Sequence, residues 1–202
     1  MKDRKLTLID LQKVKDGRFI KNYQLTYLNK NGNHKKYEMI SYNDIEHPHE
    51  LGQSENGVAI IAFNKGKLLL LREFRMAVND YIFNLVAGSM EVDETVEACV
   101  KREMFEETGL TVDRFVTILP PTFAAASMTD LKITFVVVEV SGEFNHKNAN
   151  EHEAIEGDFY TPEEVRSLLY SSKFNANCQL IAYFYSLLID FSALSGKICI
   201  GS

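Results

Sequence analysis

The spacing of apolar and polar residues divides the chain into two patterns. In residues 5–42, apolar and polar side chains alternate, and glycine-containing turn pairs stand at Asp16-Gly17 and Asn31-Gly32. Alternation with a period of two places one face of a strand toward a core and the other toward solvent, and such pairs favour hairpin turns. The pattern predicts three or so antiparallel strands within residues 1–50.

A denser apolar pattern begins at Gly57. Short runs rich in Val, Ile, Leu and Phe are typical of buried strands. They stand at residues 57–64, 67–75, 81–88, 114–120 and 131–140.

Three segments of this second part predict helices. Residues 94–108 have helical periodicity, with Asp93 placed to cap the start and Gly109 to end it. A second helix is expected to begin at Thr161-Pro162, and a third to span residues 176–191. This order predicts an α/β (α+β) fold, a mixed sheet sandwiched between helices.

The two patterns predict two domains, a small N-terminal β domain at residues 1–50 and a main domain at residues 51–202. So short a β segment buries too little apolar surface to be stable alone. It must therefore pack on the main domain or on a second copy of the chain.

Composition limits the kinds of partner. Of the 202 residues, 46% are hydrophobic and 25% charged, and the net charge is −6, which argues against nucleic-acid and membrane surfaces. An anionic small molecule stays possible because a divalent metal can reverse the local charge of an acidic pocket. The three cysteines suggest neither a disulfide framework nor a zinc site. Without a signal-peptide pattern or a long apolar run, a soluble cytoplasmic protein is expected.

The helix at 94–108 carries unusually many carboxylates. Glu103, Glu106 and Glu107 fall within five residues, and side chains three and four apart share a helix face. Their mutual repulsion is relieved if a hard cation such as Mg²⁺ binds among the oxygens. The alternative is a solvated acidic face paired with Lys101 and Arg102.

The spacing of this segment resembles the signature of the Nudix hydrolases. From Gly88 to Leu110, all nine defined positions of the Nudix box are filled. They are Gly88, Glu94, Arg102, Glu103, Met104, Glu106, Glu107, Gly109 and Leu110.

The resemblance implies a metal site that holds Mg²⁺, or alternatively Mn²⁺, against a diphosphate. It makes Glu103 and Glu107 the main ligands, followed by Glu106, with the backbone carbonyl of Ala87 as a further oxygen ligand. Carboxylates suit this role because bound metal neutralises phosphate oxygens and lowers the pKa of water. Glu94 and Arg102 are expected to brace the helix, and Cys99 to pack it.

Beyond the box, the chain is similar to the ADP-ribose pyrophosphatase subfamily. Phe74-Arg75 match an aromatic-arginine pair before the box, whereas Glu73 stands where glutamine is usual, Asn84 where glutamate is usual and Val86 where proline is usual. Arg75 and Arg72 are therefore candidates for substrate binding, since guanidinium can grip two phosphate oxygens. A surface ion pair is the alternative for these arginines.

Two further segments take part in the resemblance. The N-terminal strands are similar to a small domain that is exchanged between the subunits of a homodimer and stacks an aromatic, here Phe19, on adenine. Residues 150–165 resemble a mobile acidic loop that carries the residue activating water, here Glu153 or Glu151, with Gly157 as a hinge. On the helix at 94–108, Glu106 is a further catalytic candidate. An exposed acidic loop is the alternative.

The predicted function is metal-dependent hydrolysis of ADP-ribose or a related nucleoside diphosphate sugar to a nucleoside monophosphate and a sugar phosphate. The departures at Asn84 and Val86 leave another sugar nucleotide open, such as GDP-mannose. A third hypothesis is a non-catalytic Nudix-fold sensor of a nucleotide, although neither a degraded box nor an added DNA-binding segment is visible.

Overall fold

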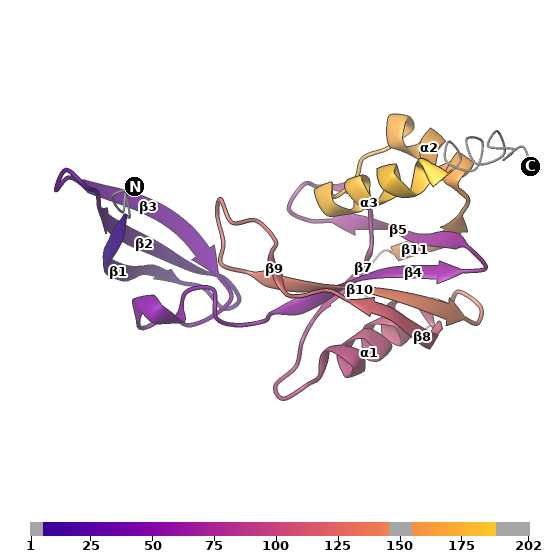
Figure 1. The fold of residues 1–202 in the computed structure, drawn as a ribbon, viewed down its shortest axis with the longest axis horizontal. Coiled ribbons are helices and arrows are strands. Elements are labelled where there is room, and N and C mark those ends of the chain that lie inside the picture. Colours follow the sequence, from indigo (N-terminus) through magenta and orange to yellow (C-terminus); the bar gives the residue numbers. More distant parts are fainter. Residues whose placement is uncertain (1–5, 146–154, 189–202) are drawn as a thin grey trace, which may run out of the picture. The chain divides into compact units, whose positions relative to one another are not determined.

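The computed structural model describes residues 6–145 and 155–188 (Figure 1). The chain forms two compact units. The first is Met1–Gly57 together with Pro120–Thr134, and the second is Val58–Leu119 together with Phe135–Ser202. The N-terminal unit therefore takes in a segment that lies far from residues 1–50 in the sequence.

Three antiparallel strands form the sheet of the first unit, as predicted. They are β1 (Thr7–Asp16), β2 (Lys21–Leu28) and β3 (His34–Ser41), paired in sequence order. A short 3₁₀ helix follows at Pro48–Glu50. Tyr23, Leu25, Met39 and Ile45 are buried between these elements.

The segment at residues 120–134 joins this unit through backbone and side-chain hydrogen bonds. Ile40 N donates to Met128 O at 2.9 Å, and Gly52 N donates to Asp130 Oδ2 at 3.2 Å. The Tyr37 hydroxyl donates to the carbonyl of Ser127. The segment also contains the short strand β9 (Thr122–Phe123).

The larger sheet has eight strands. Its main order is β11 (Ile155–Tyr160), β5 (Lys67–Arg75), β4 (Gly57–Asn64), β10 (Lys132–Ser141) and β8 (Thr111–Ile118). Beside this path, β6 (Asp80–Asn84) pairs with β5, β7 (Val86–Ser89) with β4, and β9 with β10. A tight turn joins β4 to β5, with positive φ at both Lys65 and Gly66, as hairpins of this length favour.

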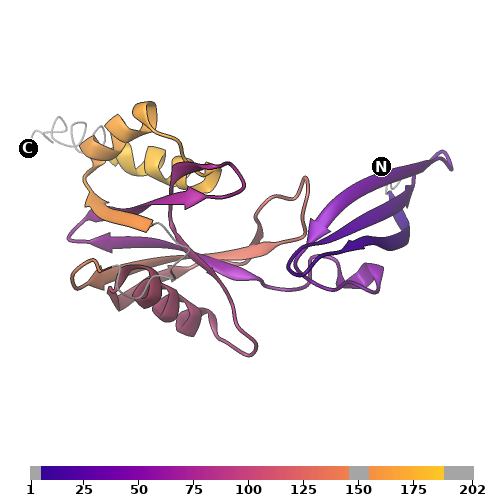
Figure 2. The same cartoon turned by 180° about the vertical axis from the view of Figure 1, so that it is seen from behind.

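Helices cover both faces of the sheet in the second unit. On one side lies α1 (Val96–Thr108), and on the other lie α2 (Pro162–Ser171) and α3 (Ala176–Ser186), as the views from front and back show (Figures 1 and 2). The core on the α1 side combines alternate residues of β5 with the inner face of the helix. These residues include Leu69, Leu71, Cys99, Val100 and Met104. The predicted fold class is confirmed.

Several predicted boundaries are wrong in detail. Residues 81–88 form two strands rather than one, because β6 pairs with β5 and β7 pairs with β4. The third helix ends at Ser186 with Leu187 as its C-cap, earlier than the expected residue 191. Gly157 lies inside β11, where an added Cβ would meet Phe144 Cε2 at 2.4 Å, so it is a packing position and not a hinge.

Candidate active site

Helix α1 is positioned by its two ends. The N-cap is Thr95, whose hydroxyl accepts a hydrogen bond from Ala98 N at 3.2 Å; Asp93, the expected cap, lies before it with a positive φ of 61°. Gly109 ends the helix in the left-handed conformation at φ 72°, as predicted. The buried side of the helix carries Val100 and Met104, so the glutamates occupy the adjoining face.

Glu103 is the buried carboxylate of this face, with 8% of its surface exposed. It presses against the backbone of β7 at Gly88. A Cβ added to Gly88 would lie 1.8 Å from Glu103 Cδ and 1.9 Å from Oε1. Only glycine leaves room for this approach. Gly88 directly follows Ala87, whose carbonyl was predicted to bind metal.

Arg102 forms hydrogen bonds with three carboxylates, those of Glu94, Glu103 and Glu106. Its Nε and Nη2 each lie 2.9 Å from one oxygen of Glu94, its Nη1 lies 2.7 Å from Glu103 Oε1, and Nη1 also lies 3.2 Å from Glu106 Oε2. A further bond from Nη2 to Ser89 O at 2.9 Å ties the guanidinium to β7. Arg102 thus braces the helix against the strand, as expected for it and for Glu94.

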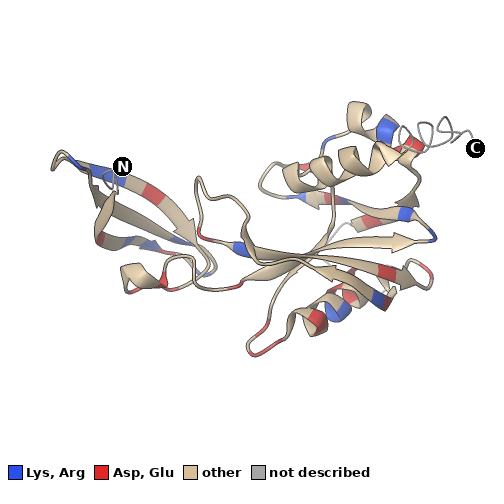
Figure 3. Cartoon of the chain, viewed as in Figure 1, with Lys and Arg blue, Asp and Glu red and all other residues tan. Residues whose placement is uncertain are grey.

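Burial and the charge of Arg102 shift the pKa values of these glutamates in opposite directions. Burial raises the pKa of Glu103, and the bond to Arg102 opposes that rise. For Glu94, the bonds from Arg102 lower the pKa to about 2, so this carboxylate stays ionised. Burial raises the pKa of the Cys99 thiol to about 12, which agrees with a packing role for this residue. The acidic residues of α1 and of the loop before it stand out in the charge view (Figure 3).

The residues fit a hard divalent cation by their chemistry. The helix carries the carboxylates of Glu103, Glu106 and Glu107, oxygen ligands of the kind that such a cation prefers. Within residues 6–145 and 155–188, no three His, Cys, Asp or Glu side chains are already grouped to hold a metal. Arg102 instead engages Glu103 and Glu106, and its charge offsets the repulsion between them.

The predicted substrate residues lie in different places. Arg75 Nε is 3.3 Å from Glu73 Oε1, whereas Arg72 forms a surface ion pair with Glu156 at 3.1 Å and lies over the Tyr81 ring. Phe19 is 68% exposed in the turn between β1 and β2. Glu151 and Glu153 lie outside the described residues.

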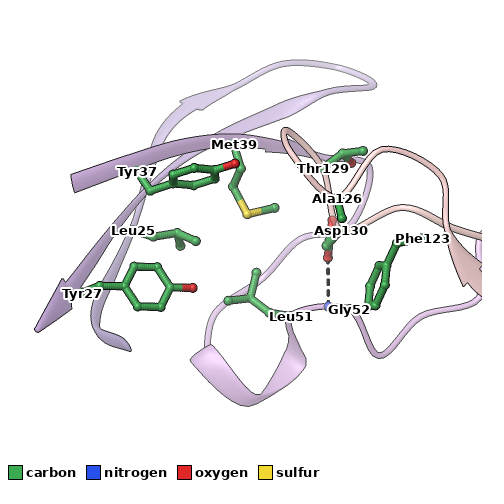
Figure 4. Close-up of a pocket in the computed structure, with 10 residues that line it drawn as sticks. All are labelled: Leu25, Tyr27, Tyr37, Met39, Leu51, Gly52, Phe123, Ala126, Thr129 and Asp130. Carbon is green, nitrogen blue, oxygen red and sulfur yellow. Dashed lines mark hydrogen bonds between the residues drawn. The ribbon is translucent and has the colours of Figure 1, made fainter. Parts of the chain in front are cut away.

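The first unit contains a pocket of about 250 Å³ that the sequence did not indicate (Figure 4). Three aromatic side chains, Tyr27, Tyr37 and Phe123, line it, and Phe19 does not. Asp130 lines it as well, is 8% exposed, and has no hydrogen-bond partner for Oδ1 within the described chain. The pocket escapes sequence analysis because its walls come from strands and a loop about a hundred residues apart.

The fold and the acidic helix together have the architecture of a hydrolase with a carboxylate-lined site. A family model described as NUDIX domain matches residues 53–179. The chain therefore belongs to the Nudix family, and it is a Nudix hydrolase. Enzymes of this family generally need a divalent metal. None of the helices in the described part of the chain is long and apolar enough to cross a membrane.

Known relatives include two sugar-nucleotide enzymes. A GDP-mannose pyrophosphatase of Citrobacter koseri is 30% identical over 146 residues, 68% of this chain and 70% of the relative. An ADP-ribose pyrophosphatase of Bacillus subtilis is 26% identical over 123 residues, 60% of this chain and 66% of the relative. A solved structure titled as an ADP compounds hydrolase shares the fold, with a TM-score of 0.68 and 21% identity over 96% of this chain and 97% of that one.

Replacing Gly88 by alanine should remove nearly all hydrolysis, because the added Cβ displaces the Glu103 carboxylate from β7. It should also destabilise the fold by about 1–3 kcal/mol, the usual cost of overpacking. Urea unfolding and steady-state rates measure the two effects. In a Glu103→Ala background, the same substitution should cost little stability, since the clashing group is gone. Equal costs in both backgrounds would contradict the assigned contact.

Proposed function

We propose that this chain hydrolyses the diphosphate of ADP-ribose or a related nucleoside diphosphate sugar, giving a nucleoside monophosphate and a sugar phosphate. Mg²⁺ is the proposed metal, with Mn²⁺ as the alternative. The observation that carries the proposal is the carboxylate face of α1 held against β7 at Gly88. The similarity to pyrophosphatases that act on ADP-ribose and GDP-mannose supports the substrate class.

Each polar residue of the site has a proposed role. Glu103, Glu107 and Glu106, with the carbonyl of Ala87, would hold the metal. When bound, such a metal neutralises the diphosphate and lowers the pKa of water. Arg102 and Glu94 keep the helix turn against β7 through the bonds described above.

The remaining polar candidates act on substrate and water. Arg75 is proposed to bind a phosphate or ribose oxygen, and Arg72, engaged with Glu156, is the weaker candidate. A carboxylate outside the box is needed to accept the proton of the attacking water, because the box glutamates are committed to metal. Glu153, or Glu151 two residues before it, is proposed for this step.

The pocket of the first unit favours a second candidate substrate, GDP-mannose. Its aromatic lining suits a purine ring, and the pocket is proposed as a base-binding site in addition to the candidate Phe19. Guanine presents N1–H and N2–H donors side by side, whereas adenine presents an N–H donor beside the N1 acceptor. The unpartnered Oδ1 of Asp130 accepts hydrogen bonds, so it favours guanine.

A homodimer is proposed for the assembled enzyme. The first unit has few fully buried apolar residues, while Ile9, Val14 and Met128 expose about half of their surface. A unit with so small a core gains stability when such side chains are covered. A second copy of the chain is the proposed cover, as in the exchanged domains that the sequence resembles.

Replacing Glu107 by glutamine should lower kcat by roughly a hundredfold or more, because a ligand charge is lost without a change of volume. Rates with ADP-ribose and GDP-mannose at saturating Mg²⁺ or Mn²⁺ test this, and Glu97→Gln, on the exposed first turn of α1, serves as a control. Full activity of the Glu107 variant in both metals would exclude the metal role. Glu153→Gln in the same assay should lower kcat more than substrate affinity.

Asp130→Asn should lower kcat/KM for GDP-mannose about tenfold relative to ADP-ribose, since an acceptor facing guanine becomes in part a donor. Competition between the two substrates measures the ratio directly. Asp113 is an exposed aspartate of the second unit that accepts a hydrogen bond from Ser141, and Asp113→Asn should leave the ratio of the two kcat/KM values unchanged. An unchanged ratio in the Asp130 variant would remove the argument for guanine.

Light scattering at micromolar concentration should give the mass of a dimer. An obligate pair of this kind buries more than roughly 2,000 Å². Ile9→Glu, on β1, should shift the mass toward the monomer if that strand is covered, whereas Val92→Glu, on the exposed loop before α1, should not. A monomer for the parent protein would refute the proposal.

A further inference from the structure

Two positions that depart from the pattern of related pyrophosphatases are bonded to each other. Asn84 Nδ2 donates to Glu73 Oε1 at 2.6 Å, and only 8% of Asn84 and 9% of Glu73 is exposed. In the subfamily that the sequence resembles, glutamine is usual at position 73 and glutamate at position 84. The pair therefore keeps one amide and one carboxylate, but the carboxylate stands on β5 instead of β6.

The exchange places the carboxylate beside an arginine. Arg75 follows Glu73 by two residues on β5, so both side chains lie on the same face of the strand. Arg75 Nε lies 3.3 Å from Glu73 Oε1, the same oxygen that accepts from Asn84. Within the described residues, Glu73 is the only ion-pair partner of Arg75.

This face is the one that carries α1. Leu69 and Leu71 alternate with Glu73 along β5 and belong to the core formed with Cys99, Val100 and Met104. Arg72 and Phe74 point to the opposite face, where Arg72 pairs with Glu156. Glu73 and Arg75 therefore lie on the side of the sheet where the acidic helix lies, and Arg72 does not.

A buried carboxylate is stable only when its oxygens are paired. Asn84 supplies one neutral donor, and Arg75 supplies the positive charge. The Arg75 side chain is 51% exposed, and the nitrogen that the ion pair engages is Nε, which precedes the two terminal nitrogens. Those terminal nitrogens form the edge that can grip two phosphate oxygens at once.

We propose that Glu73, held by Asn84, is the positioning residue for Arg75, and that it aims the guanidinium at a phosphate group of the substrate. The inference rests on the proposed function, because it takes Arg75 as a substrate contact. In this chain the carboxylate of the bonded pair is on β5 and the amide is on β6.

The test is a double-mutant cycle on Glu73 and Arg75, with ADP-ribose and GDP-mannose as probes. Glu73→Gln keeps an oxygen for Asn84 but removes the charge that holds Arg75, so KM should rise about tenfold while kcat changes less than threefold. Arg75→Ala should raise KM at least as much. In the Arg75→Ala background, Glu73→Gln should have no further effect on KM.

Two controls separate positioning from a structural role. Unfolding by urea should give the same midpoint for Glu73→Gln and the parent within a small margin, and Glu139→Gln, which breaks the exposed pair between Arg114 and Glu139, should leave KM unchanged. Additive KM effects of the two substitutions would overturn the inference, as would an unchanged KM for either single variant. The hydrolase assignment would survive those results, because Glu107→Gln tests it independently.

Discussion

The site depends on one constraint, the burial of the Glu103 carboxylate against the backbone of β7. A negative charge with 8% exposure requires partners, and Arg102 supplies one while Gly88 supplies the space. Arg102 also binds Glu94 and the carbonyl of Ser89, so the same guanidinium fixes the helix to the strand. A shift of the helix along β7 would break the bond from Arg102 to Ser89 and move Glu103 away from the space at Gly88.

The constraint explains why a chain of ordinary composition can present so many carboxylates on one short helix. Capping by Thr95 and Gly109 fixes where the helix begins and ends, and Val100 and Met104 fix which side is buried. The glutamates are then left on one adjoining face, where a single arginine offsets part of their repulsion. Nudix hydrolases generally need a divalent metal, and these carboxylates are its proposed ligands.

Buried polar groups also mark the two places where substrate selectivity is expected to lie. At the sheet, Glu73 Oε1 accepts a hydrogen bond from Asn84 and pairs with Arg75. In the first unit, Oδ2 of Asp130 accepts a hydrogen bond from Gly52 N, whereas Oδ1 has no hydrogen-bond partner among the described residues. An unpaired buried acceptor costs free energy. The bonded pair of Glu73 and Asn84 therefore holds the position of its side chains, whereas Oδ1 of Asp130 favours a ligand that donates a hydrogen bond to it.

The sequence by itself determined most of the elements, the family and the acidic face. Local signals sufficed there: glycine ends α1, alternation marks the strands, and the box spacing from Gly88 to Leu110 names the metal candidates. Tertiary structure decided what depends on distant segments. It split residues 81–88 between two strands, set Gly157 inside β11, brought Asp130 to Gly52 and bonded Asn84 to Glu73. Strand pairing and hydrogen bonds between side chains tens of residues apart produce no periodic pattern in a single sequence. Only the folded structure therefore shows them.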